Sequence, residues 1–168
     1  VVLVSPQMGD FVARHWKTIE AMLMNSNRFN GSRSKRNTVG CSVRKYIHQG
    51  MLPLYVIACW TDHESFPWPD AGVLRPYTGG GGNVIPNFVH VTNDLLWLMG
   101  FYLAEGCCYS RRGTHFLSFC SDEHYLNRAQ AVLQRELKAQ TGRATPTAAH
   151  GPSLYAHSRL LVMLFQDV

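Results

Sequence analysis

The amino-acid sequence predicts an α+β fold in two parts, and three patterns carry that prediction. Residues 85–168 alternate between amphipathic helical segments and pairs of short strand-like segments. Residues 1–84 combine one such helical segment with two strand-like runs, which we expect to form a mixed N-terminal part. Between them, residues 62–87 contain four prolines and a run of glycines, a composition that favours an irregular connector. We therefore place the domain boundary after residue 84.

In the first part, apolar residues recur at three- and four-residue steps over residues 5–25, which predicts a helix. A basic, serine-rich loop is expected to follow. Two runs rich in Val, Ile and Tyr then span residues 38–48 and 52–61, separated by Gln49 and Gly50. This pattern predicts a β-hairpin.

The second part begins with a predicted helix that Thr92 caps and Gly106 ends. Residues 107–111 and 114–120 form a predicted hairpin, and a second helix is expected over residues 123–140, closed by Gly142. Two more strand-like pieces, residues 143–149 and 153–157, precede a last helix over residues 160–165. The predicted order is helix, strand, strand, helix, strand, strand, helix.

Composition excludes several classes of protein. Hydrophobic residues make up 46%, which argues against global disorder, and no apolar run is long enough to cross a bilayer. The five cysteines include no Cys-x-x-Cys pair, so neither a disulfide framework nor a zinc ribbon is expected. The chain begins without a signal peptide or an initiator methionine. We therefore expect an intracellular, non-secreted location and a chain that is part of a longer product.

Positive charge is concentrated in two acid-free stretches, within a net charge of +5. Residues 21–61 hold Arg33, Lys35 and Arg36, and residues 106–121 hold Arg111 and Arg112. Such clusters favour a polyanionic partner, most often DNA or RNA. A solvated basic surface is the alternative interpretation.

The segment around residue 100 points to a specific chemistry. Gly100 and Ala104 share one helix face, where small side chains allow another backbone to approach closely. Glycine within a helix costs roughly 1 kcal/mol relative to alanine, which a tight helix–helix contact would offset. Glu105 lies at the carbonyl end of the same helix, where a bound cation would be favourable. The alternatives are ordinary packing for the small residues and a solvated acid for Glu105.

Residues 95–106 read LLWLMGFYLAEG, which resembles the signature of the LAGLIDADG homing endonucleases. The order of elements over residues 85–168 is similar to one half-domain of that family, in which an antiparallel sheet forms a DNA-binding saddle with the helices on one face. The resemblance implies a site-specific, metal-dependent endonuclease of double-stranded DNA. It identifies Glu105 as the catalytic, metal-binding acid and places Gly106 at the metal and scissile phosphate.

The family resemblance also implies ligands and partners. Mg²⁺, or another divalent ion such as Mn²⁺, would be the cofactor, and Gly100 and Ala104 would form the helix–helix interface. Arg111, Arg112 and His115 fall on the hairpin with which family members touch DNA, and Arg33, Lys35 and Arg36 are further DNA-binding candidates from their charge. Only one motif is present where the active site needs two. A homodimer or missing downstream sequence would supply the second half, and we expect truncation at the C-terminus.

Two other functions stay open. The first is a DNA- or RNA-binding module without cleavage, similar to a maturase or regulator. The second is a partial intein whose first half is a remnant of the splicing domain. A strand-rich horseshoe over residues 38–75 would support the intein, and a helical first half would oppose it.

Overall fold

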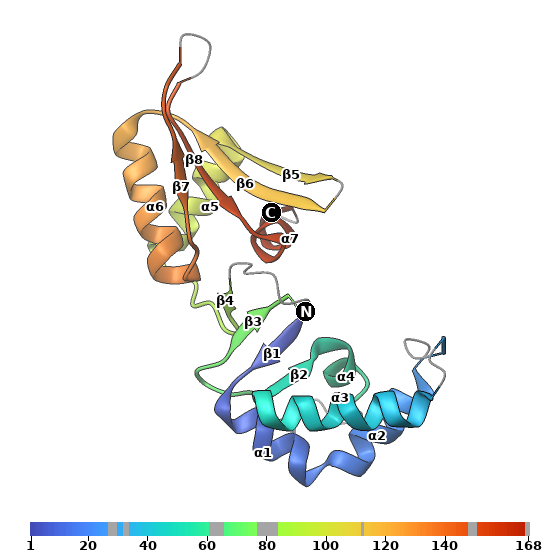
Figure 1. Cartoon of the computed structure of the whole chain (residues 1–168). Helices are drawn as coiled ribbons and strands as arrows, with labels where there is room; N and C mark the ends of the chain where they lie inside the picture. Colours follow the sequence, from blue (N-terminus) through green and yellow to red (C-terminus); the bar gives the residue numbers. More distant parts are fainter. Residues whose placement is uncertain are drawn as a thin grey trace. The chain divides into compact units, whose positions relative to one another are not determined.

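The computed structural model describes residues 1–26, 30–31, 34–60, 66–76, 84–111, 113–147 and 151–166 (Figure 1). The chain divides into two compact units, Val1–Tyr77 and Thr78–Val168. The fold is α+β, as the sequence predicts, because both units combine helices with antiparallel strands. Arg33, Arg112 and residues 62–65 and 77–83 of the predicted connector lie outside the described residues.

The first unit packs four helices against a small sheet. Its helices are α1 (Pro6–Arg14), α2 (Trp16–Asn25), α3 (Lys35–Gln49) and α4 (Leu54–Ala58). Its strands are β1 (Val2–Val4), β2 (Met51–Pro53) and β3 (Val73–Arg75), and β1 pairs antiparallel with β2 on one side and with β3 on the other.

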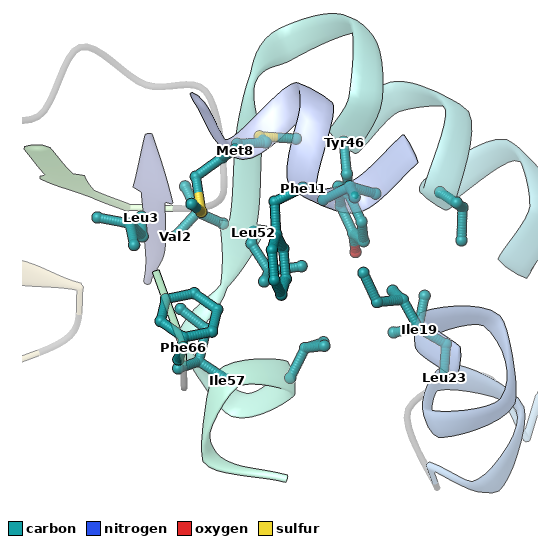
Figure 2. Close-up of a cluster of buried hydrophobic side chains, with 14 of the residues drawn as sticks. Val2, Leu3, Met8, Phe11, Ile19, Leu23, Tyr46, Leu52, Ile57 and Phe66 are labelled. Atoms are coloured by element: carbon teal, nitrogen blue, oxygen red, sulfur yellow. The ribbon is translucent and has the colours of Figure 1, made fainter. Parts of the chain in front are cut away.

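A single apolar cluster holds the first unit together. Figure 2 shows side chains from β1, the helices and the segment after α4 converging on it, including Leu3, Phe11, Tyr46 and Phe66. The ring of Phe11 lies 5.1 Å from that of Phe66, and both side chains are at most 3% exposed. At Gly9 a Cβ atom would lie 2.7 Å from the backbone oxygen of Ile47. Only glycine therefore lets α1 approach α3 so closely.

The hairpin predicted over residues 38–61 is wrong, because residues 35–49 form helix α3. Val39, Val43 and Tyr46 are its buried residues, and their four- and three-residue spacing is that of one helix face. Gly50 adopts a left-handed conformation with φ 57°, which ends the helix rather than turning a hairpin. Packing of this face on the core outweighed the strand preference of β-branched residues.

Other elements of the first unit also differ from the prediction. The helix predicted over residues 5–25 is two helices separated at His15, and β1 was not predicted. Val73–Arg75 forms strand β3 inside the predicted irregular connector, because it pairs with β1. The first half is thus largely helical where it is described, which weighs against a splicing-domain horseshoe.

The second unit has the predicted order of elements. After the short strand β4 (Ile85–Pro86) come α5 (Asn93–Glu105), the hairpin β5 (Gly106–Arg111) and β6 (Thr114–Cys120), and α6 (Glu123–Leu137). The strands β7 (Gly142–Ala144) and β8 (Ser153–His157) and the helix α7 (Arg159–Gln166) follow. The antiparallel sheet has the order β5-β6-β8-β7 (Figure 1).

The three helices of this unit cover one face of that sheet. Leu117, Phe119, Leu154 and Ala156 point toward the helices and are at most 1% exposed. Alternate residues of the same strands point to the other face. The predicted end of α6 at Gly142 is wrong, because Lys138 ends the helix in a left-handed conformation with φ 53° and Gly142 begins β7.

Candidate functional site

Helix α5 is held at its start by a cap and by ion pairs. Thr92 Oγ1 accepts a hydrogen bond from the backbone N–H of Leu95 at 3.1 Å, as the sequence predicts for a capping residue. The Asp94 carboxylate accepts hydrogen bonds from Arg128 and Arg135 of α6. These two guanidinium groups, Arg128 first, hold the pKa of Asp94 below its ordinary value. The contacts fix α5 alongside α6.

The inner side of α5 is packed by aromatic rings. Phe101 stacks on Phe119 of β6 at 5.4 Å, and Tyr102 meets the ring of Phe165 at 5.1 Å. A hydrogen bond with Cys108 raises the pKa of Tyr102 to about 12, and burial raises the pKa of the Cys108 thiol. Both groups therefore stay protonated at neutral pH, so we assign them to packing rather than to nucleophilic chemistry.

The outer side of α5 is apolar and exposed. Leu96 and Leu103 are 53% and 67% exposed, and Gly100 and Ala104 lie on the same face of the helix. A Cβ atom added to Gly100 would meet nothing within 4 Å. The helix packing predicted for Gly100 and Ala104 thus has no counterpart in the described part of this chain. The four residues form an open face, which we call the α5 face.

Glu105 lies at the end of the α5 face, where the helix turns directly into β5. The turn requires glycine next, since a Cβ atom at Gly106 would lie 2.3 Å from Tyr102 Cδ2 and 2.7 Å from the Tyr102 backbone oxygen. The Glu105 side chain is exposed and pairs with no described residue. A hollow of about 430 Å³ lies beside it, lined by Trp97, Gly100, Phe101, Ala104, Glu105, Ser121 and Tyr125.

The predicted metal site has half of a donor set in this chain. Glu105 offers a carboxylate, and the backbone carbonyls at the end of α5 are further hard oxygen donors of the kind that Mg²⁺ prefers. No group of three or more His, Cys, Asp or Glu side chains able to hold a metal occurs among the described residues. These residues therefore fit a divalent cation only when a second carboxylate is brought against the α5 face.

Arg111 and His115, the described DNA-binding candidates of the hairpin, lie on different faces of the sheet. Arg111 shares its face with Tyr109 and Phe116, away from the helices. His115 has the opposite orientation, and its Nδ1 lies 2.8 Å from Ser110 Oγ. Arg111 is thus available on the uncovered face, whereas His115 is already engaged beside the hairpin tip.

The described basic candidates of the first unit belong to a helix rather than to a loop. Lys35 and Arg36 begin α3. Lys35 Nζ donates to the Ser26 carbonyl at 3.1 Å and to Asn30 Oδ1 at 2.8 Å, so this charge helps to fix the end of α2. Arg36 is exposed, and the solvent side of α3 also carries Arg44.

An aromatic patch on the uncovered sheet face is absent from the sequence predictions. Tyr109 stacks on Phe116 at 5.0 Å, and the ring of His157 lies 5.9 Å from Phe116 and 5.4 Å from Tyr155. The alternation of aromatic or polar residues with buried apolar ones along residues 114–120 and 153–157 is the signal that locates it.

Comparison of the chain with protein-family models, with curated proteins and with solved structures found no match. No helix in the described ranges has the length and apolar character to cross a membrane.

Proposed function

We propose that the second unit is one half of a LAGLIDADG-type endonuclease that cleaves double-stranded DNA. The α5 face carries this proposal. The exposed apolar side of α5, which includes Gly100, is costly in water. It ends beside the carboxylate of Glu105, which pairs with no described residue. The order of helices and strands around it is the one that the family resemblance implies.

A second α5 helix, from another copy or from further sequence, would pack on Gly100 and Ala104. These small residues would let the two backbones approach closely, and two carboxylates would then lie together at the ends of the helices. A divalent cation held there would supply charge stabilisation and an activated water for phosphodiester hydrolysis. Arg111 would contact backbone phosphate, and the strands would lie in the major groove.

The experiment is a cleavage assay of a randomised duplex library with Mg²⁺, comparing wild type and Glu105→Gln. We expect cleavage by the wild type and a loss of at least about 100-fold with Glu105→Gln, because a metal ligand is removed. Glu20→Gln makes the same chemical change on α2 of the other unit and is expected to leave cleavage unchanged.

Two results would contradict this proposal, one for the role of Glu105 and one for cleavage itself. Equal cleavage by Glu105→Gln and wild type would remove the assigned role of the acid. Duplex binding by a folded wild type that never cleaves, with Mg²⁺ or with Mn²⁺, would favour the non-cleaving binding module instead.

A further inference from the structure

On the uncovered face of the second sheet, β6 and β8 contribute three neighbouring cross-strand pairs, which consist of aromatic and small polar residues. Phe116 lies opposite His157, Ser118 opposite Tyr155 and Cys120 opposite Ser153. All six side chains share one face, because they alternate with residues that are buried under the helices. The same six residues line a hollow of about 300 Å³. This volume is at the lower end of the range of about 300–1,000 Å³ found for ligand sites.

The rings at this hollow are held in place by their neighbours. Tyr109 of β5 stacks against Phe116 with an interplanar angle of 19°. On the other side, a Cβ atom at Gly142 would lie 2.5 Å from Tyr155 Cζ, so the Tyr155 ring lies against the backbone of β7. Phe116 and Tyr155 nevertheless stay half-buried rather than buried. Each ring is therefore fixed and still accessible, which lowers the entropy lost when a planar ligand stacks on it.

The charges around the hollow favour anionic ligands over cationic ones. None of the residues in β5, β6, β7 and β8 is an aspartate or glutamate. Arg111 lies on the same face as Tyr109 and Phe116. Hydroxyl and thiol groups of Ser118, Ser153 and Cys120 offer hydrogen-bonding atoms at the floor.

We propose that this hollow binds an unpaired base of single-stranded nucleic acid. Aromatic rings stack on the face of a base, small polar groups meet its edge, and the acid-free surroundings tolerate the phosphate chain. In a duplex the faces of the bases are covered by their neighbours, so a stacking site selects for unpaired ones. This proposal does not rest on the proposed cleavage, because Glu105 takes no part in stacking, although the same sheet face would lie against duplex DNA in the proposed endonuclease.

The test measures binding of fluorescein-labelled single strands of about 15 nucleotides, oligothymidylate and oligouridylate, to the full chain in EDTA. We expect Phe116→Leu and Tyr155→Leu each to weaken binding roughly 5- to 100-fold, because both keep an apolar side chain and lose the ring. Tyr155→Phe keeps the ring and is expected to bind within about twofold of wild type. Trp16→Leu, which removes an exposed ring from the other unit, is the matched control.

Thermal unfolding of each variant verifies that it is folded. The strand that binds more tightly, oligouridylate or oligothymidylate, identifies RNA or DNA as the natural ligand. Weaker binding of that strand by the leucine variants supports the site. Wild-type affinity in both leucine variants would overturn the proposal, as would failure of folded wild type to bind either strand at low salt. A change in sedimentation of the leucine variants without nucleic acid would also overturn it, because the face would then join two copies. Glu105→Gln is expected to bind as wild type, which separates this outcome from that of the cleavage assay.

Discussion

At the scale of single residues, Gly106 is required by the turn from α5 into β5. Its φ of −99° is open to any residue, so the requirement is spatial rather than conformational. A Cβ atom would meet the Tyr102 backbone oxygen at 2.7 Å, and backbone cannot move aside cheaply. We expect Gly106→Ala to lower the free energy of unfolding by about 1–3 kcal/mol, measured by urea denaturation.

Gly100 provides the opposite case within the same helix. A Cβ atom at this position meets nothing within 4 Å, and alanine is favoured over glycine inside a helix. Gly100→Ala is therefore expected to raise the free energy of unfolding by about 0.4–1 kcal/mol in the same denaturation experiment. A loss of stability comparable to that of Gly106→Ala would show that Gly100 is already packed against a neighbour.

At the scale of elements, Asp94 joins α5 to α6 through Arg128 and Arg135, and its effect depends on pH. Because its pKa is lowered in the folded chain, the carboxylate stabilises the fold at neutral pH, and this contribution is lost as the pH falls below the ordinary value of 3.8. We expect Asp94→Asn to lower the melting temperature slightly at pH 7, since the pair is solvent-exposed. The difference from wild type should shrink as the pH falls below 3.8, and a difference that grows there would contradict the assignment.

The exposed face of α5 makes a second prediction at this scale. Leu103 is 67% exposed, so Leu103→Glu should change the stability of the isolated chain by less than about 0.5 kcal/mol. If two α5 faces meet, the same substitution places like charges in the contact and abolishes association and cleavage. Sedimentation velocity measures the association. Met163→Glu, at a 51% exposed residue of α7, is the control that should leave it unchanged.

Comparison of the two units shows where sequence patterns were sufficient to predict the helices and strands. In the second unit, the helix periodicity and the alternation of residues 114–120 agree with the burial of these elements. The predicted cap at Thr92 is also present. In the first unit, Val39 and Val43 favour a strand locally but are buried on one side of a helix. A short strand such as β1 is defined by its pairing with distant segments, which no local pattern records.

At the scale of the whole molecule, the composition of residues 62–87 led us to place the boundary after residue 84, whereas the two compact units of the structure divide after Tyr77. The candidate site was predictable only in part. The motif located Gly100, Ala104 and Glu105, whose spacing along one helix decides their position. The aromatic patch depends on the alignment of β6 with β8, and residues distant in sequence meet there only through the strand register.

The net charge of +5 predicts that nucleic-acid binding weakens with salt, and the acid-free helix α3 contributes to it. Arg36 and Arg44 lie on the exposed side of α3. If each contacts a phosphate, Arg36→Gln and Arg44→Gln each reduce the slope of log Kd against log salt by about 0.9, the effect of one released counterion on duplex DNA. Fluorescence anisotropy across salt concentrations measures the slope. Lys17→Gln removes the same charge from α2, one turn before Glu20, and is expected to leave the slope unchanged. A wild-type slope in all three variants would mean that Arg36 and Arg44 belong to a solvated basic surface and do not contact the nucleic acid.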